Sequence, residues 1–398
     1  MDQKHNRIVL DDRSEDPVIK IFLDAIKNRA SDVHIEPGRA YFEVRYRVDG
    51  LMQPAFRQSV EQQEELMSRL KVLSSQNITE HFLPQDGFME CDYGGRSYNI
   101  RVSTMPTAFG EAMVFRIHNR EDILIEVKDL GFDNQQLETI LRLISSRSGI
   151  ILTTGPTGSG KTSLLYSLLH SINHPNRNIL SIEDPIEYHL PNIRQSQISE
   201  SLGSTYPVLM RSVVRQDPDI VMLGEIRDAE TAQMAASASL IGTLIFSTFH
   251  TFDIPALIAR LQELGVTRSI IAQSINGVIS TRLLRKNCPN CLVLYEPNDA
   301  EKRIIGDVPY EVLKKGRGCD QCKNAGYRGR TGIYEIVVFD DDLKTAVIED
   351  KPPSFIKEML GKKQIKKLRT SAVEKVVQGS TTLEESLRVL GYPMLYQG

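Results

Sequence analysis

Residues 155–162 read Gly155-Pro-Thr-Gly-Ser-Gly-Lys-Thr162, a complete phosphate-binding loop. An apolar stretch at residues 149–152 precedes the loop, and residues 163–169 after it read as a helix, so a chance match in a glycine-rich turn is the weaker interpretation. In such a loop the backbone N–H groups and the helix dipole face the phosphates, Lys161 reaches the β- and γ-phosphates, and the Thr162 hydroxyl ligates Mg²⁺. The sequence therefore predicts that ATP or GTP is bound by Gly155, Pro156, Thr157, Gly158, Ser159, Gly160, Lys161 and Thr162.

Outward from this loop, apolar runs alternate with helical segments between residue 131 and about residue 285. The expected strands are residues 149–153, 179–182, 219–223 and 244–247. This alternation is typical of an α/β domain in which helices cover both faces of a parallel sheet.

One uncharged stretch, residues 231–249, resembles a membrane span in its lack of charge. It is rich in Ala, Ser and Thr and is interrupted by Gly242. A membrane-spanning helix needs about 20 mostly apolar residues, and this stretch is too polar. The sequence instead predicts a buried helix over residues 229–241 followed by a buried strand.

The first 120 residues have a different pattern and predict a small α+β domain. Asp16-Pro17 introduces an amphipathic helix over residues 18–29, and residues 41–48 alternate as a half-buried strand before an Asp49-Gly50 turn. Residues 88–104 predict a hairpin. The expected divisions are an N-terminal α+β domain (1–120), a linker (121–130), an ATPase core (131–286), a tetracysteine subdomain (287–335) and a helical C-terminal subdomain (336–398).

Composition limits the function classes. The 398 residues are 41% hydrophobic and 25% charged, which is typical of a globular protein of several domains. The net charge of −3 does not favour nucleic-acid binding or a membrane-surface protein. The polar first sixteen residues do not resemble a signal peptide, so the expected location is cytoplasmic.

Two acidic segments follow the phosphate loop. The apolar run at residues 220–223 ends in Gly224-Glu225, and a carboxylate there can hold Mg²⁺ or polarise the attacking water. Asp219, at the start of the same run, is expected to be structural. The second segment is Ser181-Ile-Glu-Asp-Pro-Ile-Glu187, where carboxylates can activate water or bind magnesium. The alternative for each carboxylate is a solvated surface charge.

Hydrolysis also requires positive charge at the γ-phosphate, often from an arginine elsewhere. Arg101 and Arg116 lie in otherwise apolar strand segments of the first domain, and Arg47 lies in its alternating strand. Spacing alone favours the alternative that these arginines line a solvated face of the sheet.

Four of the five cysteines form two pairs, Cys288-Pro-Asn-Cys291 and Cys319-Asp-Gln-Cys322, with 27 residues between them. Two such pairs predict a structural tetrahedral zinc site, since each pair can supply two thiolates from one tight turn. Free buried thiols or redox-active pairs are the alternatives. Cys91 has no partner in the pattern and is expected to be a buried or half-buried thiol.

Together, four segments resemble the secretion and type IV pilus ATPase family: residues 155–162, Ile182-Glu-Asp-Pro-Ile-Glu187, Arg215-Gln-Asp-Pro-Asp-Ile-Val-Met-Leu-Gly-Glu-Ile-Arg-Asp228 and Ser247-Thr-Phe-His-Thr251. Ala30-Ser-Asp-Val-His-Ile-Glu-Pro37 and Leu83-Pro-Gln-Asp-Gly87 extend the resemblance to the first domain. It covers about residues 17–390. It implies a RecA-like ATPase core preceded by a PAS-like α+β domain.

The resemblance also implies roles for single residues. Glu187 takes the position of the catalytic glutamate and Glu225 that of the Walker B glutamate. Arg101 and Arg116 take the positions of the γ-phosphate arginines, and His250 falls on the phosphate-sensing histidine. The implied cofactors are ATP, Mg²⁺ and Zn²⁺.

At the level of the assembly, the resemblance implies a hexamer of this chain that hydrolyses ATP on the cytoplasmic side of the inner membrane. It would drive pilin or pseudopilin polymerisation through an inner-membrane platform protein and contact a membrane-anchor protein. Assembly-type members carry the tetracysteine element, which favours a type II secretion or pilus assembly motor over a retraction motor.

The sequence departs from the family at three positions. Thr243 replaces a frequent second histidine, Phe252 replaces the usual asparagine after His-Thr, and Pro207 lies in a segment usually free of proline. These departures leave a nucleotide-gated scaffold with little turnover as an alternative, beside a pilus retraction motor. A nucleic-acid translocase is disfavoured by the acidic net charge.

Overall fold

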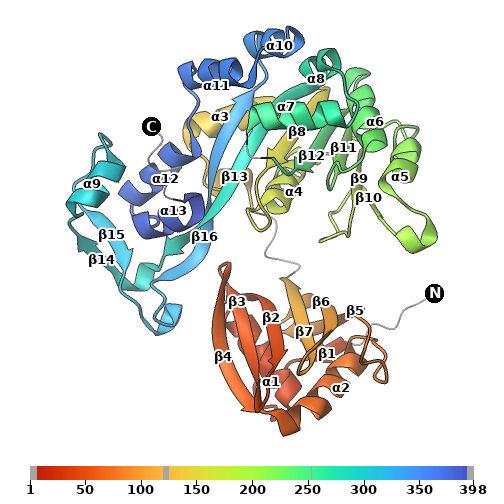
Figure 1. Cartoon of the computed structure of the whole chain (residues 1–398), viewed down its shortest axis with the longest axis vertical. Helices are drawn as coiled ribbons and strands as arrows, with labels where there is room; N and C mark the ends of the chain where they lie inside the picture. Colours follow the sequence, from red (N-terminus) through yellow and green to blue (C-terminus); the bar gives the residue numbers. More distant parts are fainter. Residues whose placement is uncertain (1–6, 120–124, 252, 392–398) are drawn as a thin grey trace. The chain divides into compact units, whose positions relative to one another are not determined.

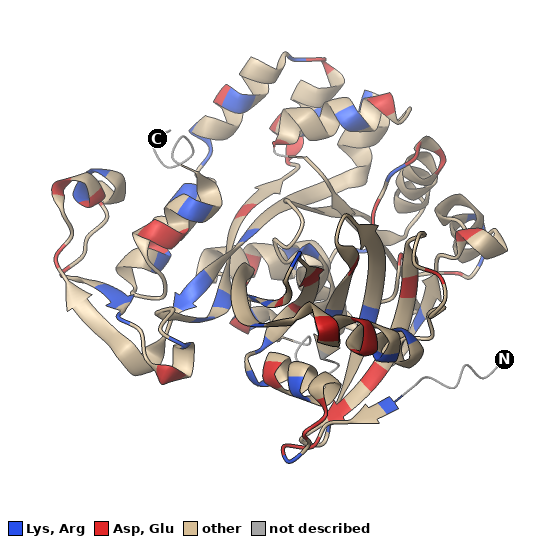
Figure 2. Ribbon diagram, turned by 60° about the horizontal axis from the view of Figure 1, so that its bottom comes forward, with Lys and Arg blue, Asp and Glu red and all other residues tan. Residues whose placement is uncertain are grey.

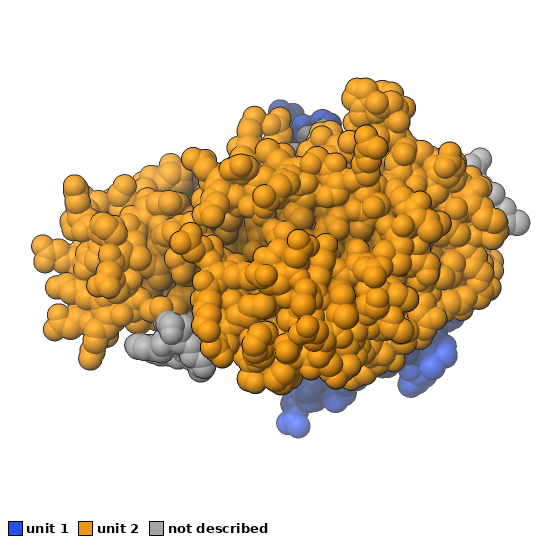
Figure 3. Space-filling view, turned by 90° about the horizontal axis from the view of Figure 1, so that it is seen from above, with its two compact units in different colours: residues 1–123 blue, residues 124–398 orange. Residues whose placement is uncertain are grey.

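The computed structural model describes residues 7–119, 125–251 and 253–391 (Figure 1). Phe252 and residues 120–124 of the expected linker lie outside these ranges. The chain forms two compact units, residues 1–123 and 124–398 (Figure 3). Basic and acidic residues are interspersed along the ribbon (Figure 2). Among the described helices, none has both the length and the apolar character needed to span a membrane.

The first unit is a seven-stranded sheet in the order β1-β5-β6-β7-β2-β3-β4, with two helices packed on one face. All neighbouring strands are antiparallel except β1 and β5. Its elements are β1 (Arg7–Val9), α1 (Pro17–Lys27), β2 (Ala30–Pro37), β3 (Tyr41–Val48), β4 (Leu51–Ser59), α2 (Gln63–Leu73), β5 (Gln85–Tyr93), β6 (Arg96–Thr107) and β7 (Gly110–Asn119). The expected strand at residues 41–48 is β3, and the expected hairpin is β5–β6.

The alternating pattern in the sequence sets which face of this sheet is covered. In β3 the side chains of Phe42, Val44 and Tyr46 are buried in one cluster with apolar residues of α1 and α2. Glu43, Arg45 and Arg47, which alternate with them along the strand, point to the other face because successive strand side chains alternate. Asp16 caps α1 by accepting a hydrogen bond from the backbone N–H of Val18 at 2.9 Å.

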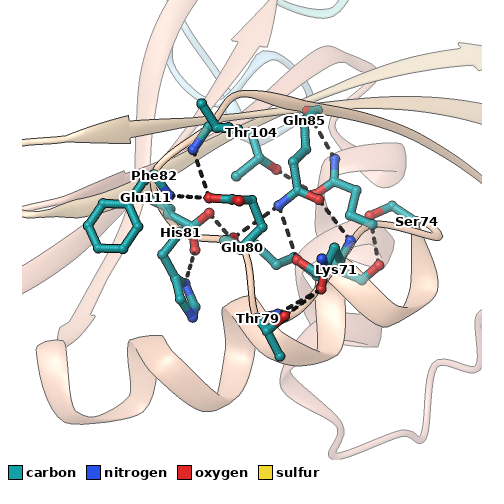
Figure 4. A network of polar contacts seen from close by, with 12 residues as sticks. Lys71, Ser74, Thr79, Glu80, His81, Phe82, Gln85, Thr104 and Glu111 are labelled. Atoms are coloured by element: carbon teal, nitrogen blue, oxygen red, sulfur yellow. Dashed lines mark hydrogen bonds and ion pairs between the residues drawn. The ribbon is translucent and has the colours of Figure 1, made fainter.

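A polar network fixes the segment between α2 and β5 (Figure 4). Lys71 on α2 is only 1% exposed. Its Nζ lies 2.6 Å from Glu111 Oε1 and donates a hydrogen bond of 2.6 Å to the Glu80 carbonyl. The half-exposed His81 approaches the other oxygen of Glu111, Oε2, at 2.8 Å. This network joins α2, the loop that follows it and β7.

We expect Glu111→Gln to destabilise the first unit by about 3 kcal/mol or more, because it leaves the buried Lys71 ammonium without its counter-charge. Urea unfolding of the full chain, followed by hydrogen exchange of α2 amides, measures the change. The matched control is His81→Gln, which removes the solvent-facing partner of the same carboxylate and should cost less than about 1 kcal/mol. Equal stability of Glu111→Gln and wild type would contradict the importance of this pair.

The second unit contains a seven-stranded sheet in the order β10-β9-β11-β12-β8-β13-β16 (Figure 1). The first six strands are parallel, and β16 is antiparallel to β13. Its strands are β8 (Gly149–Thr154), β9 (Ile179–Glu183), β10 (Ile193–Gln197), β11 (Ile220–Leu223), β12 (Leu244–Phe249), β13 (Ile275–Asn287) and β16 (Tyr327–Val338), with β14 (Leu292–Tyr295) and β15 (Leu313–Gly316) as a separate pair. The four strands expected from the sequence are β8, β9, β11 and β12.

Helices lie on both faces of this sheet, as the sequence predicts. Ile150 and Leu152 of β8 belong to a large apolar cluster with α5, α6, α7, α8, α10 and α11, whereas α4 packs against β8 and β12 through other side chains. The helices are α3 (Asn134–Ile144), α4 (Lys161–Ile172), α5 (Tyr206–Val213), α6 (Ala229–Leu240), α7 (Ile254–Glu263), α8 (Arg268–Ser274), α9 (Asp299–Ile305), α10 (Asp341–Ile348), α11 (Pro353–Lys362), α12 (Leu368–Val377) and α13 (Leu383–Leu390). The buried helix predicted near residues 229–241 is α6.

A second, smaller core lies around the far end of the β13–β16 pair. Leu284 of β13 and Ile333 of β16 share an apolar cluster with α9, β15, α12 and α13. Glu385 on α13 is fully buried and forms ion pairs with Arg285 of β13 at 2.8 Å and with Arg388 at 2.6 Å. These contacts attach the C-terminal helices to the strand that leads into the cysteine-rich segment.

Candidate functional site

The phosphate loop connects β8 to α4. All six residues of β8 are buried, and α4 begins at Lys161 directly after Gly160. The loop needs glycine at its first position, because a Cβ on Gly155 would lie 2.5 Å from Ser159 Oγ and 2.7 Å from the Thr281 carbonyl. Thr162 is exposed in the first turn of α4, so its hydroxyl is accessible to a metal ion. The geometry fits the predicted phosphate site.

Lys161 is folded back onto the loop. Its Nζ donates hydrogen bonds to the carbonyl oxygens of Gly155 at 2.7 Å and Pro156 at 3.0 Å. Burial, and next the nearby charge of Arg282, lower the pKa of Lys161, while the carboxylate of Glu225 acts in the opposite direction. Phosphate oxygens are stronger acceptors for an ammonium group than backbone carbonyls. The side chain is therefore positioned to exchange these carbonyls for a polyphosphate.

Parallel pairing brings the predicted catalytic residues of the second unit, Glu187, Glu225 and His250, to the carboxyl ends of neighbouring strands. Strands β9, β11, β12 and β8 are consecutive neighbours, and their carboxyl ends therefore lie on the same side. At this edge β8 enters the phosphate loop, β12 is followed by His250, β11 by Gly224 and Glu225, and β9 by the segment carrying Glu187. Ligands of open α/β sheets bind at this carboxyl edge.

Glu225 lies in a group of charged side chains at the end of β11. Its side chain is 16% exposed, forms a close ion pair with Arg227 and approaches His250 Nε2 at 3.8 Å. Arg227 also lies 3.8 Å from Asp184, which follows β9. The Gly224 backbone is held on both sides, by its N–H to the Ile182 carbonyl at 2.8 Å and by Thr248 Oγ1 to its own carbonyl at 2.7 Å. Arg227 thus lies between Glu225 and Asp184, and His250 lies beside Glu225.

The segment that carries Glu187 is anchored by a buried carboxylate. Glu183, at the end of β9, is 1% exposed and accepts hydrogen bonds from Tyr166 on α4, from Ser181 and from Gln195 of β10. Glu187 itself is half-buried. Because Tyr166 belongs to the helix that starts at Lys161, Glu183 connects the Glu187 segment to the phosphate-binding helix.

Two of the sequence departures acquire a structural explanation. Thr243 precedes β12, whereas His250 follows it, so the two residues lie at opposite ends of this strand. Thr243 Oγ1 donates to the Pro218 carbonyl at 3.3 Å. Pro207 lies in the first turn of α5, where a missing N–H costs no helical hydrogen bond.

Asp219 accepts a hydrogen bond from the Asn178 backbone at 2.7 Å, a structural contact.

The three candidate arginines, Arg47, Arg101 and Arg116, lie on one face of the sheet of the first unit. Arg101 and Arg116 are directly opposite one another on β6 and β7. Asp32 of β2 is buried and lies 3.0 Å from Arg116 Nε and 3.5 Å from Arg47 Nε. Burial, followed by the charges of Arg101 and Arg116, lowers the pKa of His118 to about 4. The result is a basic stripe in which one carboxylate, that of Asp32, orients Arg47 and Arg116.

The four paired cysteines come together in the second unit. Their Sγ atoms all lie within 4.8 Å of one another, with Cys288–Cys319 at 3.9 Å, Cys291–Cys322 at 3.8 Å and Cys319–Cys322 at 3.7 Å. Tetrahedral Zn²⁺ with Zn–S bonds of about 2.3 Å requires sulfur–sulfur separations of roughly 3.8 Å. All four residues are free thiols rather than disulfides. The donor set therefore fits zinc.

Each cysteine pair occupies one tight turn, Pro289–Cys291 or Asp320–Cys322. Cys322 Sγ accepts hydrogen bonds from the N–H groups of Cys319 at 3.2 Å and Gly326 at 3.3 Å. Burial raises the pKa of Cys322, but these backbone donors outweigh it and bring the pKa to about 7. Such N–H donors are the second-sphere contacts expected around a metal-bound thiolate. Cys91 is buried in the first unit, as expected.

The chain matches the model of the type II/IV secretion system protein family over residues 11–388. It belongs to this family. It is 40% identical over 385 residues to the type II secretion system protein E of Dickeya dadantii (strain 3937), covering 96% of this chain and 77% of that protein. It is also 40% identical over 379 residues to the type IV pilus assembly ATPase PilB of Myxococcus xanthus (strain DK1622), covering 93% and 67%. The predicted family is confirmed, and with it the general assignment to secretion and pilus ATPases.

Solved structures confirm the fold. The Legionella pneumophila ATPase DotB aligns with a TM-score of 0.67 at 21% identity, covering 96% of this chain and 98% of that one. The pilus retraction motor PilT with bound ADP aligns with a TM-score of 0.62 at 23% identity, covering 94% and 97%. At such identities the likeness concerns the fold alone, and it supports the α/β architecture of this member of the type II/IV secretion family.

Sequence reasoning missed several charged residues of the site. Arg227 links Glu225 to Asp184, and Glu183 anchors the neighbouring segment. Asp32 orients two arginines of the first unit. Arg282 lies beside the phosphate loop from β13, a strand that the sequence analysis did not identify. A charged residue inside an otherwise apolar run was the available signal for Arg282.

Proposed function

We propose that this chain is the ATP-hydrolysing motor of a type II secretion or type IV pilus assembly machine. The observation that carries the proposal is the placement of the phosphate loop, Glu225 and His250 at one edge of the parallel sheet. The family, and the names of relatives that are 40% identical to this chain, are the basis for proposing secretion or pilus assembly as the process it drives. The tetracysteine cluster, which fits a structural zinc site, supports the assembly or secretion branch over retraction.

In the proposed reaction, water attacks the γ-phosphate and ADP leaves. The phosphate loop would hold the polyphosphate through its N–H groups, and Lys161 would neutralise charge on the β- and γ-phosphates. Mg²⁺, when bound by Thr162 and by Glu225 or a water between them, supplies further positive charge there. Glu187 would orient and deprotonate the attacking water, and His250 would respond to the state of Glu225 and the phosphate.

In this proposal, the further positive charge needed at the γ-phosphate comes from arginines of the first unit. Arg101 and Arg116 would approach the γ-phosphate when a first unit closes on an ATPase unit. Asp32 would keep Arg116 oriented until that point, since their ion pair is partly exposed and can exchange for a phosphate. We propose that the working assembly is a hexamer of this chain, located at the cytoplasmic side of the inner membrane. Its partners would be a platform protein and a membrane-anchor protein.

The experiment is deletion of this chain in its host, with complementation by wild type or by Lys161→Ala. Pili or secreted cargo are expected to be lost on deletion and restored by wild type alone. Surface pili are counted, and cargo is measured inside and outside the envelope. An increase in pili would replace the assembly assignment with a retraction motor. Restoration by Lys161→Ala would exclude an ATP-driven motor and favour a scaffold.

A further inference from the structure

The strand β13 supports the phosphate loop from behind. Ser280 Oγ lies 2.9 Å from Thr154 Oγ1, at the end of β8. Thr281 Oγ1 donates to the Ser159 carbonyl at 3.2 Å, and Leu283 lies against the position of a Cβ on Gly160 at 3.2 Å. Ser280, Thr281 and Leu283 of β13 thus contact the residue before the loop and the residues that lead into α4.

Arg282 lies among these contacts and is nine-tenths buried. A Cβ placed on Gly155 would lie 3.0 Å from Arg282 Nη1, so the guanidinium is at the first residue of the phosphate loop. Its Nη1 donates a hydrogen bond of 2.8 Å to the Thr281 carbonyl. Within the described ranges, no carboxylate forms an ion pair with Arg282.

A buried guanidinium without a carboxylate is unusual, because buried charges are normally paired. Two other buried charges of this chain follow that rule: Glu385 is paired with Arg285 and Arg388, and Lys71 is paired with Glu111. Arg282 instead has Lys161 as a charged neighbour. Burial lowers the pKa of Arg282, and burial followed by the charge of Arg282 lowers the pKa of Lys161. The one carboxylate that acts on Lys161, that of Glu225, is itself paired with Arg227, so the two neighbouring cations form a site with excess positive charge.

We propose that Arg282 is a nucleotide-binding residue that supplies a second positive charge to the polyphosphate from within the same chain. A nucleoside diphosphate or triphosphate provides the anionic charge that the two cations lack. A guanidinium has donors to spare beyond the one used on the Thr281 carbonyl. The inference rests on the proposed nucleotide binding. It goes further by assigning a role in binding to β13, which lies outside both the phosphate loop and the first unit.

The competing explanation is that Arg282 only braces the chain through the Thr281 carbonyl. The two explanations predict opposite effects on the protein without nucleotide. Removal of a brace lowers thermal stability, whereas removal of an uncompensated buried cation leaves it unchanged or raises it. A polyphosphate-binding arginine also contributes to affinity, and a charge-assisted hydrogen bond of about 1.5–3 kcal/mol corresponds to a roughly 10–100-fold change in dissociation constant.

The test is calorimetric binding of Mg-ADP to the full chain, together with thermal unfolding without nucleotide. Wild type, Arg282→Gln, Arg282→Lys and the control Arg330→Gln are compared. Arg330 is an exposed arginine on the neighbouring strand β16. We expect Arg282→Gln to weaken Mg-ADP binding by roughly 10–100-fold at unchanged or higher melting temperature. Arg282→Lys should retain part of the affinity, and Arg330→Gln should match wild type.

Each other outcome is informative. Wild-type affinity in Arg282→Gln would overturn the inference while leaving nucleotide binding intact. A lower melting temperature of Arg282→Gln with wild-type affinity would establish a bracing role instead. Absence of Mg-ADP binding to wild type would refute the proposed function itself, together with this inference.

Discussion

Glu225→Gln is expected to lower ATP turnover by about 10²–10⁴-fold while leaving Mg-ADP affinity within a few-fold of wild type. The amide has the size of the carboxyl group, so the packing at the end of β11 is kept. It lacks the negative charge that would hold the metal or its water ligands, and it cannot form the ion pair with Arg227. The measurement is steady-state phosphate release from the purified full chain with Mg²⁺ and ATP.

The matched control for this change is Glu230→Gln. Glu230 lies in the first turn of α6, is exposed and pairs with Arg211. Its substitution therefore removes the same charge as Glu225→Gln, but from a surface position nearby in the chain. Its turnover should stay near that of wild type. If wild-type turnover were already as slow as that of Glu225→Gln, the motor hypothesis would fail and the nucleotide-gated scaffold would be favoured.

Removal of the metal from the tetracysteine cluster is expected to unfold the segment around residues 288–326. The wild-type chain should carry about one Zn²⁺, since four thiolates bind one ion. Zinc binding in small structural sites contributes on the order of 10 kcal/mol to the folding of the ligand segment. Cys291→Ser, or dialysis against a strong chelator, removes most of this stabilisation. Zinc is measured by atomic emission, and local unfolding by hydrogen exchange of amides in that segment.

The unfolding should extend into β13. Asn287, the last residue of β13, directly precedes Cys288, and its side chain donates to the carbonyls of Lys314, Gly379 and Thr381 at 3.0–3.1 Å. Exchange is therefore expected to rise also in α12 and α13, which share the smaller core. Cys91→Ala is the control, because Cys91 is a buried thiol outside the cluster and its loss should leave the zinc content unchanged. A zinc-free wild type with equally slow exchange in this segment would exclude a structural metal.

Local sequence patterns were sufficient for much of the fold. The Gly155–Thr162 sequence identifies its own strand, loop and helix because a phosphate-binding loop depends on contacts within one short segment. The alternation of β3 and the buried runs of β9, β11 and β12 are likewise local signals. The antiparallel β13–β16 pair was missed, because its two strands are separated by 39 residues and pair only in the folded chain.

The sequence by itself determined the nucleotide loop, the acidic strand ends, the cysteine pairs and the family, since each is a pattern of neighbouring residues. Only the tertiary structure decided that Arg227 joins Asp184 to Glu225, that Asp32 orients Arg116, and that Arg282 lies buried beside the loop with no ion-paired carboxylate among the described residues. The reason is physical. The electrostatic environment of a charge depends on which strands are neighbours in the sheet, and that order, β9-β11-β12-β8-β13, does not follow the order of the chain.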